Sequence, residues 1–465
     1  MLERILEVKR REVAERKRDA SMESLLARCG PSTRSLSTAL IRARPGFLLE
    51  IKFASPSAGA IRDAAELDTV LGSYRRHADA ISVLTDRTFF GGSFELLARA
   101  RERVDQPLLC KDFVLDPYQV AEARLHGADA ILLILAAIDD PSWKACRGIA
   151  ERLGMEVLTE VHDESEARRA IGLGAPIIGV NNRNLGTLEV AIGTTSRLAP
   201  LIPPDRVVIA ESGIETRDQV TRLRGSADAF LVGTSLMREP DLDRAVRQLV
   251  YGRTKVCGLT RGEHAHAARE SGATHGGLVF AAASPRRVTR DRAAAIKAEV
   301  ALEWVGVFAD QEPEEVAAIA HQLELDAVQL HGNESTETVS RVRAKVPSRC
   351  EVWQALPVTD AIPAASSPAA DRLLLDGGNP NRAPGARRGG WGEPFDWRLL
   401  DQYPGKEAVV LAGGLGPGNA ARAAALGTWA LDTSSGVESA PGEKDPARLA
   451  RFFAERRRLP GRGSS

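Results

Sequence analysis

The 465-residue chain has few cysteines, and the five that it has are widely separated. No two of them are spaced as CxxC, and no cysteines and histidines cluster at zinc-binding spacing. An odd number of scattered thiols argues against a disulfide framework and is typical of a reduced, cytoplasmic protein. We therefore expect free thiols, a cytoplasmic location and no metal site.

Neither sign of charge is in excess, because 62 lysine and arginine residues are matched by 62 aspartate and glutamate residues. A chain without a basic surplus has no general attraction for nucleic acid or anionic membranes. No stretch approaches the about 18 uninterrupted apolar residues of a membrane-spanning helix. The N-terminal sequence MLERILEVKRREVAERKRDA is charged throughout and lacks an apolar signal core. Nucleic acid and membrane are therefore not expected as partners, and small molecules remain.

Short, almost continuously apolar runs recur along the chain and alternate with segments of helical spacing. Such runs are typical of parallel strands covered on both faces, and their alternation with helices indicates β/α units. The first series is FLLEIK (47–52), AISVLTD (80–86), PLLCKDF (107–113), AILLIL (130–135), MEVLTEV (155–161), IIGVNN (177–182), RVVIAESG (206–213) and AFLVGT (229–234). Eight units in about 200 residues favour a closed (β/α)8 barrel over an open sheet.

The same rhythm then restarts with a second series of eight runs, from KVCGLT (255–260) to WALDTSSG (429–436). The sequence thus predicts an α/β protein with two consecutive (β/α)8 TIM barrels and no linker between them. The predicted domains are residues 1–252, beginning with a helical extension (1–46), and residues 253–458, followed by a disordered tail (459–465). The extension either covers one barrel mouth or forms a solvated collar.

Charged and amide residues stand at the carboxyl ends of five strands of the first predicted barrel. In this fold the active site lies at those ends and in the loops that follow, whereas the interior is packed with branched apolar side chains. One such residue would be explained as a rim charge, but a set that converges on one mouth favours a catalytic site. The candidates are Glu50, Lys52, Lys111, Glu160, Asn181, Arg183 and Glu211.

Glycine and hydroxyl residues follow the seventh and eighth strands of both predicted barrels. They expose backbone N–H groups, which is how barrels of this kind hold a phosphate. Glycine also serves plain turns, but its repetition at the same place in both halves predicts that both bind phosphorylated small molecules. The residues are Ser212, Gly213, Gly233 and Thr234 in the first barrel and Gly413, Gly414, Ser434 and Ser435 in the second.

The second predicted barrel has fewer ionisable residues at its strand ends, namely Cys257, Arg261, His331 and Asp376. A thiol and a carboxyl on opposite strands can move a proton as general base and general acid, without metal or cofactor. A lone buried cysteine is more often structural, so Cys257 alone is ambiguous. The histidines of HAH (264–266) lie on a predicted helix, where positions two apart do not share a face, and we reject a metal site there.

The strings at these positions resemble two enzyme families. The first half resembles indole-3-glycerol-phosphate synthase in EIKFASPSAGAIR (50–62), LLCKDFVLDPYQ (108–119), GVNNRNL (179–185) and IAESGI (209–214). The second half resembles phosphoribosylanthranilate isomerase in KVCGLTR (255–261), SPR (284–286), FDW (395–397) and TSSGVE (433–438). Together they resemble the fused bifunctional enzymes of bacterial tryptophan biosynthesis, over about residues 1–455.

For the first barrel the resemblance implies closure of an indole ring on carboxyphenylaminodeoxyribulose phosphate, with loss of CO2 and water. It implies Lys111 as general acid at the ribulose carbonyl and Glu160 as the partner acid or base in the dehydration. Glu50, Asn181 and Glu211 would orient groups and stabilise charge. The implied binding residues are Lys52 for a carboxylate or phosphate (with an acid role as an alternative), Arg183 for the departing carboxylate, and Ser55, Ser212, Gly213, Gly233 and Thr234 for the phosphate.

For the second barrel the resemblance implies the preceding step, an Amadori rearrangement of phosphoribosylanthranilate. Asp376 would protonate the ribose ring oxygen, and Cys257 would remove the C2 proton, a role that requires a lowered thiol pKa. Arg261, four residues further along the chain, is a candidate for lowering it. Arg286 would pair with the anthranilate carboxylate, His331 would help to bind substrate, and the implied phosphate residues are Gly413, Gly414, Ser434 and Ser435.

Three positions depart from the family pattern. Phe53 follows the first strand where basic residues are common, Ala58 replaces a common lysine, and Trp391 stands in a GGWG string where a small residue is usual. The resemblance implies no cofactor and phosphorylated small molecules as substrates, and we expect a monomer.

Three other interpretations stay open on the residues alone. Barrels acting on other phosphosugars would carry paired aspartates on strands one and five, which this sequence lacks. A non-catalytic sensor would keep the phosphate residues and lose the acids and bases, which are present here. One barrel could also be active while the other serves as scaffold.

Overall fold

The computed structural model describes residues 1–465 except 57–58, 364–365, 378–393, 460–461 and 463–465. The chain divides into two compact units. The first comprises Met1–Val246 and the described residues from Leu459 onward, and the second comprises Arg247–Arg458.

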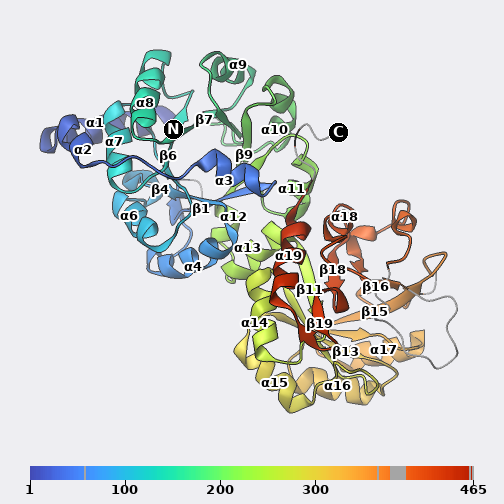
Figure 1. The fold of residues 1–465 in the computed structure, drawn as a ribbon. Helices are drawn as coiled ribbons and strands as arrows, with labels where there is room; N and C mark the ends of the chain where they lie inside the picture. Colours follow the sequence, from blue (N-terminus) through green and yellow to red (C-terminus); the bar gives the residue numbers. More distant parts are fainter. Residues whose placement is uncertain (57–58, 364–365, 378–393, 460–461, 463–465) are drawn as a thin grey trace. The chain divides into compact units, whose positions relative to one another are not determined.

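The first unit is a closed barrel of parallel strands, in which each strand pairs with its neighbour in the chain and the last pairs with the first (Figure 1). Its strands are β1 (Gly46–Ile51), β4 (Ala80–Leu84), β5 (Leu108–Lys111), β6 (Ala130–Ile134), β7 (Glu156–Val161), β8 (Ile177–Asn181), β9 (Val207–Glu211) and β10 (Ala229–Val232). Nearly every position of these strands is buried, because the interior and the surrounding helices cover both faces.

Helices follow the strands and form the outer layer of the first barrel. Several begin at an aspartate whose carboxylate accepts a first-turn backbone N–H, for example Asp116, Asp139 and Asp163. The helices are α4 (Leu67–His77), α5 (Arg87–Phe90), α6 (Phe94–Arg103), α7 (Pro117–Leu125), α8 (Asp140–Arg152), α9 (Glu164–Gly172), α10 (Gly193–Leu198), α11 (Arg217–Leu223), α12 (Thr234–Met237) and α13 (Leu242–Tyr251). A short hairpin, β2 (Ala54–Ser55) with β3 (Gly59–Ala60), lies in the loop after β1.

The helical extension covers the amino-terminal end of the first barrel with one of its helices. It consists of α1 (Leu2–Asp19), α2 (Met22–Arg28) and α3 (Leu36–Arg42). On α3, Leu36 and Leu40 are fully buried in the same apolar cluster as the interior strand residues. Ser37 donates to Glu156, which begins β7. The sequence left open whether the extension covers one barrel mouth or forms a solvated collar. Helix α3 covers one barrel mouth.

Helix α1 is anchored near the opposite, carboxyl end of the strands through Lys9. This ammonium is 1% exposed and lies 2.9 Å from each of Glu12, Asp86 and Asp112. Asp86 is the N-cap of α5 and Asp112 directly follows β5, so one buried cation holds two catalytic-end loops to the extension.

The second unit is also a closed parallel barrel with neighbouring strands paired in chain order. Its strands are β11 (Arg253–Cys257), β12 (His275–Val279), β13 (Glu303–Phe308), β14 (Ala327–Leu330), β15 (Glu351–Val358), β16 (Arg372–Gly377), β17 (Val410–Leu411) and β18 (Ala430–Thr433). Its helices are α14 (Gly262–Ser271), α15 (Arg290–Glu299), α16 (Pro313–Gln322), α17 (Thr336–Lys345), α18 (Ala420–Ala424) and α19 (Pro446–Arg457). Short 3-10 turns lie at Trp397–Leu400 (η3), Lys406–Ala408 (η4) and Ser435–Val437 (η5), and β19 (Glu438–Ala440) pairs with β20 (Glu443–Lys444). The prediction of two consecutive (β/α)8 barrels is confirmed.

The junction between the barrels is a single residue, Gly252, with a positive φ of 74° between α13 and β11. The compact units divide at Arg247, within α13, whereas the sequence-based boundary follows residue 252. The sequence predicts a disordered tail at residues 459–465, but two of these residues make contacts in the structure. Leu459 is buried, and Arg462 donates to the carbonyls of residues 199, 202, 203 and 206.

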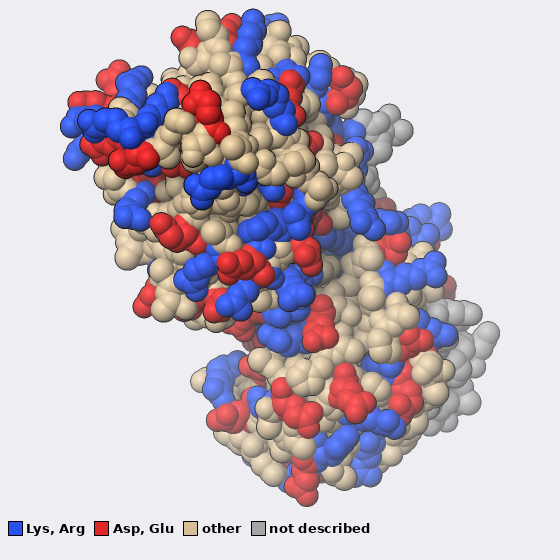
Figure 2. Space-filling model, turned by 60° about the vertical axis from the view of Figure 1, so that its left-hand side comes forward, with Lys and Arg blue, Asp and Glu red and all other residues tan. Residues whose placement is uncertain are grey.

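No helix in the described parts of the chain is long and apolar enough to cross a membrane. Positive and negative side chains are interspersed over the surface seen in Figure 2. This mixture agrees with the equal numbers of acidic and basic residues in the sequence.

Candidate active site

Lys111 lies at the centre of a cluster of buried charges in the first barrel. It ends β5, and its Nζ lies 3.9 Å from Glu50 Oε2, 3.7 Å from Glu160 Oε2 and 3.5 Å from Glu211 Oε2. Those carboxylates come from β1, β7 and β9, so the barrel brings together residues that lie far apart in the sequence. Lys52 lies 2.8 Å from the other oxygen of Glu50.

The cluster holds its members in unequal protonation states. Burial lowers the pKa of Lys111, but the three carboxylates outweigh burial and raise it above the ordinary lysine range. Burial opposes ionisation of Glu160, and Lys111 and His162 more than offset it, so its pKa is lowered. Burial dominates at Glu211, whose pKa is raised despite Lys111. Two buried glutamates with opposite shifts are typical of an acid–base site.

Glu160 is held by neighbours on two sides. Asn181 Nδ2, at the end of β8, donates to Glu160 Oε1 at 3.1 Å. His162 Nε2 lies 3.1 Å from the same oxygen. Among the described residues, neither oxygen of Glu211 receives a hydrogen bond, although both are buried. Its Oε2 faces Lys111 Nζ at 3.5 Å, so the ammonium is its electrostatic partner.

Two glycines make room for these carboxylates. A Cβ on Gly179 would lie 2.0 Å from Glu211 Oε1, and a Cβ on Gly233 would lie 2.5 Å from Glu50 Oε1. Any side chain at either position would displace the glutamate beside it.

The loops after the seventh and eighth strands have the same backbone in both barrels. Ser212 and Gly213 have φ of 65° and 76°, and Gly413 and Gly414 have 88° and 62°. For a serine such a value is strained, and strain of this kind is found at functional sites. The residues after the eighth strands also agree, since φ and ψ are −134° and −78° at Gly233 and −137° and −85° at Ser434.

A matching hydrogen bond fixes each pair of loops. Ser235 Oγ donates to Ile214 O at 3.0 Å in the first barrel, and Thr433 Oγ1 donates to Leu415 O at 2.7 Å in the second. Thr234 and Ser435 begin α12 and η5, where backbone N–H groups lack helical partners. The repeated sequence pattern thus corresponds to a repeated geometry.

Cys257, at the end of β11, is buried in an apolar layer with Val279 and Val307. Burial raises its thiol pKa, while Lys255 and Lys444 act in the opposite direction. The expected lowering of this pKa is therefore absent in the free protein. Lys255 itself lies 2.8 Å from Asp432 in a buried ion pair.

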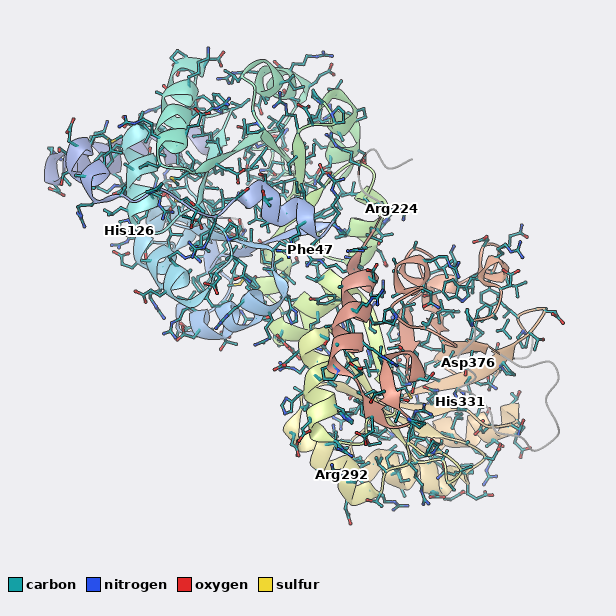
Figure 3. All side chains as sticks on the ribbon, viewed as in Figure 1. Phe47, His126, Arg224, Arg292, His331 and Asp376 are labelled. Atoms are coloured by element: carbon teal, nitrogen blue, oxygen red, sulfur yellow. The ribbon has the colours of Figure 1, made fainter. Side chains whose placement is uncertain are left out.

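Asp376, the penultimate residue of β16, lies beside His331, which follows β14 (Figure 3). His331 Nε2 lies 3.3 Å from Asp376 Oδ2, and Gln329 Nε2 lies 2.7 Å from His331 Nδ1. A Cβ on Gly413 would lie 2.8 Å from Asp376 Oδ1, so the acid stands directly against the loop after the seventh strand.

The two arginines expected at the second site are already paired. Arg286 forms a bidentate pair with Glu438, and its side chain packs against Gly258, next to Cys257. Arg261 is half-exposed and lies 2.7 Å from Glu443. The cations with the largest effect on the thiol pKa are Lys255 and Lys444, and Arg286 also interacts with the thiol.

The remaining predicted residues lie around these centres or outside the described chain. Ser55 is buried in β2, and Arg183 Nη1 donates to Leu188 O at 2.9 Å within its own loop. Ala58 and Trp391 lie outside the described residues, as does most of the long loop 377–393. Phe53 is buried.

Sequence reasoning missed several charged neighbours of these sites. His162 and Lys255 each stand two residues from a candidate on the same strand run, and the alternation that joined Glu50 to Lys52 would have found them. Nothing in the sequence marks Lys9, because it lies in a highly charged helix. In the described part of the chain no group of three or more His, Cys, Asp or Glu side chains is arranged so that it could hold a metal ion.

Fold and site together define a two-barrel protein with an acid–base centre in each barrel. The family model of indole-3-glycerol phosphate synthase matches residues 2–249, and that of N-(5'-phosphoribosyl)anthranilate isomerase matches residues 254–455. The chain belongs to the family of proteins that join these two enzymes in one polypeptide.

Two bacterial relatives of similar length agree with this assignment. The tryptophan biosynthesis protein TrpCF of Vibrio cholerae is 46% identical over 438 residues, covering 94% of this chain and 91% of the relative. The protein of the same name from Salmonella typhi is 43% identical, covering 95% of both chains. Among solved structures, phosphoribosyl anthranilate isomerase from Thermus thermophilus is 37% identical, covers 44% of this chain and 97% of its own, and has a TM-score of 0.38.

Proposed function

We propose that this chain catalyses two consecutive steps of tryptophan biosynthesis. The second barrel isomerises phosphoribosylanthranilate to carboxyphenylaminodeoxyribulose phosphate, and the first converts that product to indole-3-glycerol phosphate, CO2 and water. The observation that carries the proposal is Lys111 among three buried carboxylates, in the barrel matched by the synthase family.

In the first barrel, Lys111 is the general acid at the ribulose carbonyl. Its raised pKa keeps it charged at neutral pH, so that it stabilises the oxygen on which negative charge develops as the ring closes. Glu160, ionised because its pKa is lowered, takes up a proton in the dehydration. Glu50, Asn181 and Glu211 orient these two groups.

The anionic parts of the substrate need cationic or N–H partners. Lys52 and Arg183 supply positive charge for the carboxylate, and a guanidinium suits a carboxylate that leaves as CO2. In the first barrel the phosphate binds to the loops after β9 and β10. In the second barrel it binds to the equivalent loops, after β17 and β18. The proposed phosphate residues are Ser55, Ser212, Gly213, Gly233 and Thr234 in one barrel and Gly413, Gly414, Ser434 and Ser435 in the other.

In the second barrel, Asp376 protonates the ribose ring oxygen, which opens the ring to a Schiff base. Cys257 as thiolate then removes the proton from C2, and the resulting enolamine tautomerises to the ketone. Lys255 and Lys444 favour the thiolate. Arg286 releases its partner Glu438 and binds the anthranilate carboxylate in its place. His331 and Arg261 contribute to substrate binding.

The protein acts as a cytoplasmic monomer on small phosphorylated substrates and needs neither metal nor cofactor. Reduced thiols and balanced charge support this part of the proposal.

The direct test supplies purified protein with phosphoribosylanthranilate and follows indole-3-glycerol phosphate. Formation of the indole product with release of CO2 is expected. Tight binding of the substrate without turnover would contradict an enzyme and favour a phosphometabolite sensor.

A further inference from the structure

His162 occupies an unusual position between two carboxylates at the end of β7. Its Nε2 lies 3.1 Å from Glu160 Oε1, and its Nδ1 lies 3.0 Å from Glu166 Oε2. Glu166 stands in the first turn of α9, and its Oε2 also accepts the backbone N–H of His162 at 2.8 Å. The imidazole is only 12% exposed.

This geometry favours the doubly protonated ring. A neutral imidazole has one N–H, so one of its nitrogens would present a lone pair to a carboxylate oxygen. An imidazolium donates from Nδ1 to Glu166 and places its positive charge beside Glu160, whose Oε1 lies within ion-pair distance of Nε2. Burial alone would lower the pKa of His162, but the neighbouring carboxylates of Glu160 and Glu166 raise it to about 10.

The charges around Glu160 explain why a further cation is needed there. Lys111 approaches from β5, Asn181 from β8, Glu211 from β9 and Glu50 from β1. Lys111 is shared among three carboxylates.

Among the described residues, His162 is the one cation that contacts Glu160 but contacts neither Glu50 nor Glu211. It meets Oε1, while Lys111 meets Oε2. The two oxygens of Glu160 therefore have separate cationic partners.

We propose that His162 is a positioning residue for ring closure, an imidazolium fixed by Glu166 that aims the Glu160 carboxylate at the substrate and keeps it ionised. This inference rests on the proposed role of Glu160 as base. Removal of the cation makes protonation of Glu160 easier, so activity is lost first at low pH and recovers as pH rises.

The first test compares His162→Gln with the wild-type chain in the pH dependence of ring-closure kcat. The acidic limb is expected to move up by about one to three pH units, the shift that one adjacent opposite charge produces. The matched control is His126→Gln, since His126, labelled in Figure 3, is the C-cap of α7 and stacks on Phe94. An acidic limb in the same place for all three proteins would overturn the inference.

Isomerase activity, measured on the same samples, reports whether the variant chain is otherwise intact. It is expected to be unchanged in His162→Gln. A wild-type chain that closed no indole ring would contradict the proposed function instead, so the two failures are distinguishable.

The second test observes the ring itself and does not depend on activity or on the folding of a glutamine variant. In an NMR titration of the wild-type chain, the His162 imidazole is expected to stay protonated beyond pH 8. Glu166→Gln identifies the signal, because the loss of one carboxylate lowers the pKa of that histidine. Titration of His162 near its ordinary pKa of about 6.5 would overturn the inference.

Discussion

The two barrels share strand order and loop geometry, yet they differ in the charge at the carboxyl ends of their strands. The first gathers three glutamates, two lysines and a histidine around one point. The second has an apolar layer around Cys257 with the buried Lys255–Asp432 ion pair beside it, and Asp376 and His331 stand at the ends of other strands. Ring closure with loss of CO2 moves much charge, whereas the isomerisation moves protons within one molecule, and the lining of each mouth reflects that difference.

The loops that the barrels share and the strand ends in which they differ therefore have separate functions. The residues following the seventh and eighth strands have similar backbone angles in both barrels, which fits the proposal that both loops hold a phosphate. The strand ends diverge because each reaction needs its own acid and base.

The largest expected effect is the loss of one activity while the other is kept. Lys111→Ala is expected to reduce ring closure by about 10²–10⁴-fold or more and leave isomerisation unchanged, since a positioned acid contributes that factor. Cys257→Ala is expected to do the reverse. Separate steady-state assays of each step check both variants, and loss of both activities in either one would contradict independent sites.

Lys9→Met tests the anchoring of the extension, which only the first barrel has. It leaves Asp86 and Asp112 buried without their cation, and such a loss costs about 3–5 kcal/mol of stability. Chemical denaturation of the chain measures it. Lys17→Met on the same helix is the control, because its exposed pair with Asp116 contributes about 0–1 kcal/mol. Equal effects of the two variants would show that the buried cluster has no special role.

Gly179→Ala is expected to push Glu211 out of place and lower ring-closure kcat by about 10²-fold, since a shift of about 1 Å at reacting groups has that effect. The control is Gly148→Ala on α8, where a new Cβ meets nothing within 4 Å. Ring closure at the wild-type rate in Gly179→Ala would contradict a role for Glu211.

The isomerase step is expected to accelerate with pH through 9, because the active form is the thiolate and burial raises the pKa of Cys257. The double variant Lys255→Met/Asp432→Asn removes the nearest cation together with its partner, so the pKa rises further. A loss of about tenfold in kcat/KM is expected at pH 8 for each added pKa unit, with recovery at higher pH. A profile that is flat from pH 7 to 10 would exclude a titrating thiol base.

The smallest effect is expected for Arg261→Ala. Its ion pair with Glu443 is exposed and contributes about 0–1 kcal/mol, so isomerase kcat should change by less than about fivefold. A fall in kcat that exceeds the change in KM would mean that Arg261 moves to the thiol during turnover.

The sequence was sufficient to predict both barrels, because strands covered on two faces are apolar at nearly every position and recur regularly. It also predicted Lys111, Glu160 and Glu211 as neighbours, since strand ends of a closed barrel converge. It could not predict which cations act on Cys257, because Lys444 reaches the site from a hairpin after the last strand. Nor could it reveal that Lys9 is buried, since only the packed helix α1 distinguishes it from its exposed neighbours.

The measurement that tests the account most directly uses Lys111→Ala and Cys257→Ala, each supplied with phosphoribosylanthranilate alone and then mixed. Lys111→Ala is expected to accumulate carboxyphenylaminodeoxyribulose phosphate, Cys257→Ala to leave the substrate unchanged, and the mixture to form indole-3-glycerol phosphate. A mixture that forms no indole product, or a Cys257→Ala protein that forms it alone, would contradict two complementary sites in one chain.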